Sequence, residues 1–450
     1  MIPDSLLPET LEDWAAEAQV PHGLADRALA GRAPRARRRS ITMMLAAAAT
    51  VVVVTVGMLV PRLLDGPPAR PDPASPRYPV PTPVDVTTPV SPPTEVTPAD
   101  LPASLDIQTD PENSPPKRLI TAGRIAVSAY YVSGTEKIGK NSDRGHDTWY
   151  LYDPRTGTYE MTDWSNLDVA PGMKYAAVLE RDLPARRVGI LDMTTRELRW
   201  VALEQPATYV SWSPDGSRIL VTSFDKDPSI RTGIRDGGNS WSVPRFRRLG
   251  FHIVDAASAT ATFHPVAGEA IGQPESAPFR WNLDGTLVSG PNLTRAMRPT
   301  KPEQPDRLYY DLDGRPHDAP ERDVNPSSEV DYSPDGRLYA GVLQQKIPDA
   351  VRTLSPEDLE KLRAQGPRGP ETFVTDVASG QVVGRQEMLQ LRAWADDGHL
   401  VALQCLGTCR DEFDARLVVV TLDGSKSVRL SGEMLDSQRP GSWHPLLTRR

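Results

Sequence analysis

The stretch that most constrains the fold is Thr208–Ser223, with the sequence TYVSWSPDGSRILVTS. Residues 209–212 predict one strand and residues 218–223 a return strand, because both are rich in β-branched, aromatic and aliphatic side chains. The Ser-Pro-Asp-Gly between them is typical of a tight turn. Pro214 fixes φ at the second turn position, and Gly216 can adopt the left-handed conformation that closes a bulged hairpin. The stretch therefore predicts an antiparallel β-hairpin.

This hairpin recurs in weaker copies and alternates with a second unit, an apolar strand that ends at an Asp and a turn. Further copies of the hairpin are 168–180, 279–290, 329–343 and 391–405, while 123–131 fits only its second half. Copies of the second unit are 149–157, 188–197, 251–258, 308–314, 373–380 and 417–424. Each pair of units supplies four strands, which is the content of one β-propeller blade. Residues 118–450 therefore predict an all-β domain, a six-bladed β-propeller, with seven blades as the alternative count.

Two of these copies also carry a resemblance to a known family. The segments WSPDGSRILV (212–221) and YSPDGRLYAG (332–341) resemble the WD40-like repeats of the TolB propeller and of related bacterial proteins. The resemblance implies a scaffold that binds through loops at one end of its central channel, and it implies no single chemistry. Single-pass anchored propellers of this layout are typical of actinobacterial cell surfaces. The chain departs from the TolB pattern in having an anchor, a stalk and no separate globular domain before the propeller.

An uncharged span of twenty residues, Ile41–Val60, follows the basic residues Arg35, Arg37, Arg38 and Arg39. That length crosses the hydrocarbon core of a membrane, and the arginines hold the N-terminus on the cytoplasmic side. A cleaved signal peptide is the alternative, but its apolar stretch is shorter and no A-x-A site follows the span. We therefore expect a signal anchor in the cell membrane, with residues 1–40 as a short cytoplasmic tail and the C-terminal domain extracellular.

Residues 61–117 hold many of the 45 prolines of the chain, mixed with Thr, Ser, Val and Asp. This composition cannot build a core and favours extended polyproline II conformations. We expect a proline-rich disordered linker over 61–117. A semi-rigid stalk that lifts the domain away from the membrane and a linker with no required reach both fit the composition.

Motifs for catalysis or metal binding are missing from the sequence. A propeller-associated peptidase would need a G-x-S-x-G elbow in a βαβ region, and neither occurs. None of the seven histidines has metal-ligand spacing with another, and Asp311–Gly314 reads as a turn because Arg315 and Pro316 follow it. The net charge of −8, without a clustered basic face, argues against nucleic acid. We expect no enzyme activity, no cofactor and no metal.

Two insertions are too long for their hairpins, Asp225–Gly250 and Lys346–Pro370, and such loops often carry function. The second contains a predicted capped helix, 355–366. The first concentrates cationic and aromatic side chains, which are favoured anchors of binding surfaces. The predicted binding residues are Arg231, Arg235, Trp241, Arg247 and Arg248. An anionic wall polymer or an acidic cell-envelope protein would suit their charge, and two solvated loops are the alternative.

The two cysteines and the C-terminus add two structural expectations. Cys405 and Cys409 are spaced C-x3-C, and outside the membrane we expect them to form a disulfide, because Gly407 lets the chain turn back. A regulated thiol pair is the alternative. Residues 441–445, GSWHP, resemble the entry to the inner strand that the first blade lacks before Gly123. The two ends of the domain are therefore expected to share a blade, which would remove a sheet edge.

Together these features favour a membrane-anchored extracytoplasmic β-propeller that acts as a ligand- or protein-binding scaffold at the cell surface. The first alternative is a transmembrane sensor that relays to a cytoplasmic partner through residues 1–40. The second is a hydrolase or lyase with its site in the propeller channel.

Overall fold

A computed structural model describes the chain in segments. The described residues are 83–84, 91–232, 246–266, 270–271, 277–292, 307–320, 330–341, 371–387, 390–406, 415–434 and 442–450. They belong to the second of two compact units, 1–77 and 78–450. The predicted tail (1–40), membrane span (41–60) and inserted helix (355–366) lie outside them. Within the described segments, no helix is long and apolar enough to span a membrane.

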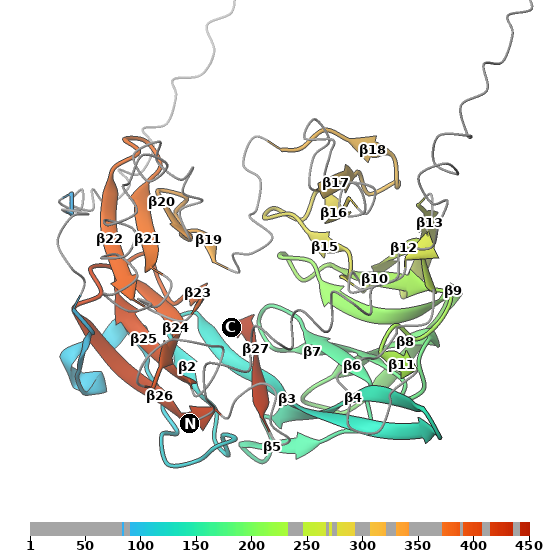
Figure 1. Ribbon diagram of the computed structural model, residues 1–450, viewed down its shortest axis with the longest axis horizontal. Coiled ribbons are helices and arrows are strands. Elements are labelled where there is room, and N and C mark those ends of the chain that lie inside the picture. Colours follow the sequence, from blue (N-terminus) through green and yellow to red (C-terminus); the bar gives the residue numbers. More distant parts are fainter. Residues whose placement is uncertain are drawn as a thin grey trace, which may run out of the picture. The chain divides into compact units, whose positions relative to one another are not determined.

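The described residues form five β-sheets in a propeller-like arrangement (Figure 1). The first contains β2 (Thr121–Ala122), β3 (Ile125–Gly139), β4 (Ser142–Asp153), β5 (Thr158–Met161), β11 (Ile230–Thr232) and β27 (Trp443–Arg449). The second contains β6 (Asn166–Val169), β7 (Tyr175–Leu179), β8 (Ala185–Asp192), β9 (Leu198–Trp212), β10 (Arg218–Phe224), β12 (Phe246–Asp255), β13 (Thr260–Pro265) and β14 (Ala270–Ile271).

The other three sheets follow later in the chain. The third contains β15 (Arg280–Trp281), β16 (Val288–Pro291), β17 (Arg307–Tyr310) and β18 (Pro316–His317). The fourth contains β19 (Asp331–Tyr332), β20 (Leu338–Gly341), β21 (Glu371–Asp376) and β22 (Val382–Glu387). The fifth contains β23 (Gln390–Trp394), β24 (His399–Cys405), β25 (Ala415–Thr421), β26 (Lys426–Met434) and the short β1 (Thr94–Glu95).

The hairpin predicted at 208–223 is confirmed. Strands β9 and β10 pair antiparallel, and the turn between them closes through the Gly216 N–H, which donates to the Ser213 carbonyl over 2.9 Å. Gly216 has φ +72°, the left-handed conformation that its position requires. The side chain of Asp215 accepts hydrogen bonds from the hydroxyl groups of Ser213 and Ser217, which makes it a turn residue as expected.

Strand β9 is long enough to serve two neighbours. Its first half, Leu198–Ala202, pairs with β8, and its second half, Tyr209–Trp212, pairs with β10. The second sheet therefore holds two consecutive hairpin pairs of the repeat on one continuous ladder. A shared strand fixes the position of one pair relative to the next through backbone hydrogen bonds.

The C-terminal segment completes the first sheet. Strand β27 pairs antiparallel with β3, from Trp443 opposite Val132 to Arg449 opposite Ile125. Trp443 is fully buried and lies edge-on to Tyr130, with ring centroids 5.7 Å apart. This confirms the prediction that the two ends of the domain share one sheet. The pairing covers the edge of β3 with backbone hydrogen bonds, as an unprotected sheet edge would need.

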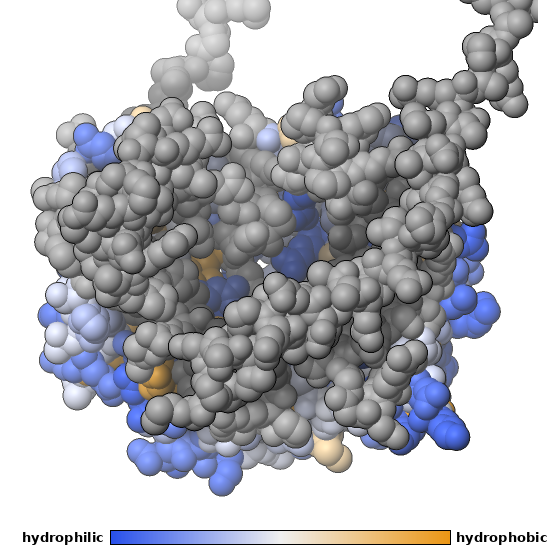
Figure 2. All heavy atoms as spheres, viewed as in Figure 1, coloured by the Kyte–Doolittle hydropathy of each residue, from blue (hydrophilic) through white to orange (hydrophobic). Residues whose placement is uncertain are grey.

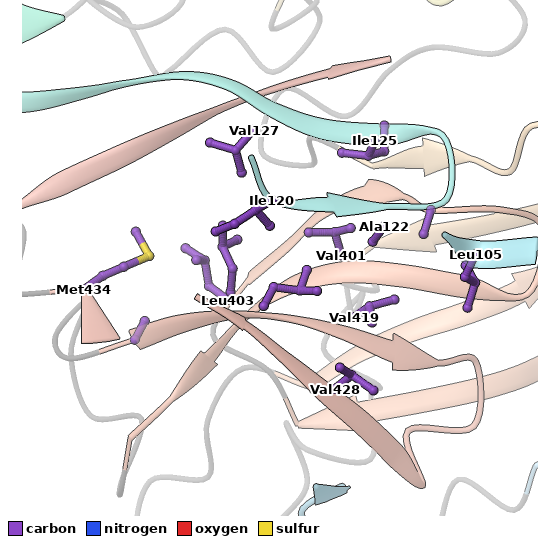
Figure 3. Packing of buried hydrophobic residues seen from close by; sticks show 14 of the residues in the cluster. Leu105, Ile120, Ala122, Ile125, Val127, Val401, Leu403, Val419, Val428 and Met434 are labelled. Carbon is purple, nitrogen blue, oxygen red and sulfur yellow. The ribbon is translucent and has the colours of Figure 1, made fainter. Parts of the chain in front are cut away.

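The segment before Thr121 differs from the expected disordered linker. Strand β1 pairs in parallel with β26, and two 3-10 helices follow, η1 (Pro98–Asp100) and η2 (Ala103–Leu105). Leu105 is fully buried in the core between β2, β3 and the fifth sheet (Figure 3). Although proline-rich, the segment contributes apolar side chains at intervals and pairs with an outer strand. Residues 91–117 therefore belong to the packed domain.

The predicted turns at the ends of apolar strands are also present. Asp311 accepts hydrogen bonds from the backbone N–H groups of Asp313 and Arg315, which identifies Asp311–Gly314 as a turn. Cys405, at the end of β24, is disulfide-bonded. Cys409, the other cysteine of the chain, lies outside the described residues, so the Cys405–Cys409 pairing stays a prediction.

Candidate functional site

The inner ends of the sheets enclose two adjoining cavities, of about 520 Å³ and about 560 Å³. Residues of β6, β9, β15, β19, β23 and β27 line them, so that every sheet contributes its innermost strand. Both cavities share a group of lining residues: Asp168, Trp212, Leu283, Asp331, Arg392 and Arg449. Figure 2 shows hydrophilic surface in the hollow between the sheets on the viewed face.

Tryptophans of the repeat hold the walls of the cavities together. The indole N–H of Trp212 donates to the Asp168 carbonyl over 3.2 Å, and that of Trp281 donates to the Ser211 carbonyl over 3.1 Å. The indole of Trp394 donates in the same way to the Asp331 carbonyl, over 3.3 Å. Each bond joins the innermost strand of one hairpin to that of another. The aromatic residue of the motif is therefore a brace, and the polar residues beside it line the cavities.

Four arginines and two aspartates are the charged residues of this lining. The arginines are Arg124, Arg280, Arg392 and Arg449, and the aspartates are Asp168 and Asp331. Arg392 donates a hydrogen bond to the Gln390 side chain over 3.2 Å. Among the described residues, the guanidinium groups of Arg124, Arg280 and Arg449 have no hydrogen-bond or ion-pair partner. Elsewhere in the domain many arginines are paired, as Arg187 is with Glu180 at 2.6 Å.

Arg124 and Arg449 lie close enough to affect each other. Burial lowers the pKa of the Arg124 guanidinium, and repulsion from Arg449 lowers it further, while Asp397 partly opposes the shift. Burial also lowers the pKa of Arg449. Both groups remain cations at neutral pH, because an arginine pKa lies far above it. The cavity therefore holds two neighbouring, partly desolvated positive charges.

Asp168 is one of the two carboxyl groups that line the cavities. Burial raises the pKa of Asp168 to about 6, although backbone hydrogen bonds from Trp212 and Val169 oppose the shift. Its two oxygens accept those N–H groups over 2.6 Å and 2.9 Å. The carboxyl group is thus committed to its own walls and forms no ion pair with the cavity arginines. With this pKa, a small fraction of the molecules at neutral pH carry Asp168 in its protonated, uncharged form.

The binding residues predicted from the long insertion are not brought together as expected. Arg248 is almost fully buried; its guanidinium donates to the carbonyls of Ala277 and Pro291 and stacks on Phe279, 4.2 Å from the ring centroid. It is a core residue, because β12 continues past the insertion and turns this side chain inward. The prediction was wrong for this residue.

The other predicted binding residues are more dispersed. Arg247 is exposed and forms an ion pair with Asp225 at 3.3 Å. Arg231 lies in β11, opposite Asp143 of β4. Arg235 and Trp241 lie outside the described residues, as do residues 346–370 of the second insertion.

The sequence analysis did not predict the cavity arginines, although Arg280 lies one residue and Arg392 two residues before a repeat tryptophan. Their place in the repeat, one or two residues before the brace, is the signal that could have found them.

Histidines and acidic residues form no metal site in the described part of the chain, where no group of three or more His, Cys, Asp and Glu comes together. His252 is fully buried, as expected of a structural histidine. Its Nε2 accepts the Gln205 N–H over 3.3 Å, so its Nδ1 carries the proton and donates to Ser223 over 3.2 Å. Burial lowers the pKa of His252 to about 4, which keeps it neutral, and because its protonated Nδ1 faces Ser223 it does not accept the Ser223 proton.

Comparison with known proteins gives similarity to solved structures alone. No protein-family model matches the chain, and no curated protein matches it. The tricorn protease is similar over 70% of this chain and 31% of its own, with 11% identity and a TM-score of 0.27. TolB from Acinetobacter baumannii is similar over 68% and 67%, with 12% identity and a TM-score of 0.31. An oligogalacturonate lyase in complex with manganese is similar over 68% and 80%, with 11% identity and a TM-score of 0.33.

Proposed function

We propose that this chain is a ligand-binding scaffold whose ligand occupies the two adjoining cavities at the centre of the sheets. The observation that carries the proposal is the lining: innermost strands from all five sheets bring uncommitted arginines together. A cavity of several hundred Å³ with a few convergent polar groups is the usual form of a small-molecule site. The proposal includes a closed ring of six blades, in which β9 belongs to two blades and β27 completes the first.

The proposal places the ligand site outside the cell. Residues 41–60 would anchor the chain in the membrane, residues 1–40 would lie in the cytoplasm, and the domain would face the envelope. The support is the uncharged span and the arginines before it, read from the sequence. A scaffold of this kind would present its cavity to envelope components without needing a catalytic group.

A hydrolase or lyase in the same cavities is the second candidate, and Asp168 is the observation that favours it. A carboxyl group whose pKa burial raises to about 6 is suited to donate a proton near neutral pH. Its hydrogen bonds to Trp212 and Val169 weigh against this role, because they hold both oxygens on the wall. Loss of turnover in an Asp168→Asn variant, with ligand binding kept, would favour the enzyme.

Photo-crosslinking from inside the cavity tests the binding proposal. Leu283 lines both cavities and its side chain is 42% exposed, so a photoreactive amino acid placed there faces the ligand. The full-length protein carrying this residue is irradiated in its native envelope, purified in mild detergent and weighed intact by mass spectrometry. We expect an adduct of defined mass at position 283.

The matched control places the same photoreactive residue at Met161, at the end of β5, where the side chain is 66% exposed. Met161 does not line either cavity. The proposal requires that the adduct of position 283 be absent at position 161. Equal labelling at both positions, or none at position 283, would contradict a ligand site in the cavities.

A further inference from the structure

The charge of the cavity lining is opposite to that of the whole chain. The chain has a net charge of −8, whereas four arginines and two aspartates line the cavities. Asp168 forms no ion pair with these arginines, since its oxygens accept backbone N–H groups of β6 and β9, and the two aspartates together balance only two of the four positive charges. A local excess of positive charge inside an acidic domain concentrates anions at the centre of the molecule.

Arg124 and Arg449 carry this excess in the first cavity. Arg124 directly precedes β3, and Arg449 is the last residue of β27. Because β27 pairs with β3, the two residues lie near each other at the first cavity. Their backbones are tied to neighbouring sheets: the Arg124 N–H donates to the Ala395 carbonyl, and the Arg449 carbonyl accepts the Gly172 N–H, each over about 3 Å. The guanidinium groups are therefore placed by rigid elements, which favours a preorganised site.

Asp397 acts on Arg124 from a distance, but within the described residues neither Arg124 nor Arg449 forms an ion pair, and two such neighbouring cations are costly unless an anion joins them. Removing like charges from water is unfavourable, and a bound counter-ion compensates for it. A guanidinium donates two parallel N–H groups, a geometry that matches the oxygens of a carboxylate or a phosphate. Ser333 and Thr448 line the same cavity, but their hydroxyl groups are bonded to Asp335 and Ser128, so the guanidinium groups are the donors that face a ligand.

Resting on the proposed function, we infer that the ligand is a small organic anion whose carboxylate or phosphate group binds between Arg124 and Arg449. Arg392, which lines both cavities, extends the cationic wall toward the second cavity and Arg280. Leu283 and Trp281 line the second cavity beside them and suit an apolar portion of the same ligand. The inferred class is thus an anion with an apolar or neutral body, and it excludes neutral ligands.

Thermal unfolding of the full-length protein in mild detergent tests this inference with two probes, citrate for carboxylates and inorganic phosphate for phosphates. Sodium chloride at matched ionic strength is the reference, and glycerol is the neutral comparison. At about ten times its Kd, a bound anion should raise the Tm by about 2–4 °C. The probe that gives the rise identifies the chemical class. No rise with either anion beyond the chloride reference would overturn the inference.

A charge-matched pair of variants locates the effect. Arg124→Gln with Arg449→Gln should weaken binding of the stabilising anion by about tenfold or more, as expected when charge-assisted hydrogen bonds are lost. Arg181→Gln with Arg186→Gln removes the same two charges from exposed positions and should bind like the parent. Arg124→Lys with Arg449→Lys, which keeps the charge, should recover part of the affinity. Equal weakening in both Gln pairs would show a general charge effect and overturn the inference.

The anion-binding experiment and the crosslinking experiment can fail independently of each other. An adduct at position 283 together with no anion effect would leave the cavity a ligand site but remove its anionic ligand. No adduct at position 283 would contradict the proposed function itself. Comparison of the melting curves of the variants without ligand shows whether each one is folded.

Discussion

Arg247 and Arg248 are neighbours in the chain with opposite environments. Arg248→Ala should lower the free energy of unfolding by about 2–4 kcal/mol, since it leaves two backbone carbonyls without donors and removes the contact with Phe279. Arg247→Ala breaks only an exposed ion pair and should cost less than about 1 kcal/mol. Urea denaturation of the two variants checks the difference. Equal losses would show that Arg248 does not support the core.

Asp168 predicts a pH dependence of stability. Its pKa is raised to about 6 in the folded protein, so between about pH 4 and pH 6 the folded state binds more protons than the unfolded state. The free energy of unfolding attributable to this group is therefore largest below pH 4 and falls as the pH rises through 6. Denaturation of the parent and of Asp168→Asn across this range should give a smaller fall in the variant.

The Asn variant should also be less stable overall, because its amide nitrogen cannot accept the Trp212 N–H as the carboxylate oxygen does. Other groups titrate in the same range, and the difference between parent and variant isolates Asp168. A parallel pair of curves would mean that the carboxyl group has an ordinary pKa. If an anion binds in the cavity, its affinity should rise below pH 6, where Asp168 loses its negative charge.

At the scale of the element, β27 is the strand on which the first sheet depends. Trp443→Ala removes a fully buried side chain of β27, its contact with Tyr130 and the hydrogen bond of its indole to Ser114. We expect a loss of about 3–5 kcal/mol in the free energy of unfolding. Met161→Ala, at an exposed position of the same sheet, should change it little. A small effect of the Trp443 change would mean that β27 is dispensable for the fold.

The sequence predicted the hairpins well because their turn chemistry is local. Pro214, Asp215 and Gly216 satisfy the turn by themselves, and the same residue types recur at 334–336. The pairing of β27 with β3 was also predictable, since residues 442–445 repeat the Trp-containing entry of the inner strand. Both cases depend on short sequence patterns that form the same local structure at each position in the chain where they occur.

The segment before Thr121 and the cavity were less predictable, for a different physical reason. Leu105 is buried because β2, β3 and the fifth sheet surround it, and none of these contacts is local in sequence. Arg124 and Arg449 are separated by more than three hundred residues and meet only because β27 pairs with β3. Composition shows that the segment is rich in proline and the insertion rich in arginine. It does not show whether each of these side chains packs in the core, lines a cavity or faces solvent.

On the scale of the whole molecule, the proposed topology decides which anions the inferred site can meet. The chain as a whole carries a net charge of −8, while four arginines and two aspartates line the two cavities, where we infer that an anion binds. Anionic ligands are abundant on both sides of a membrane, so the side on which the domain lies decides which of them it meets. The orientation of the chain is therefore the next property to measure.

The orientation follows from the proposed anchor, Ile41–Val60, and the arginines that precede it. A reporter that is active only outside the cytoplasm should work when fused after Val60 or after Arg450, and should fail when fused after Pro34. Replacing Arg35, Arg37, Arg38 and Arg39 by Gln should weaken this bias, because positive charge holds the flank in the cytoplasm. A reporter that is active after Pro34 and silent after Arg450 would reverse the topology and place the cavity in the cytoplasm.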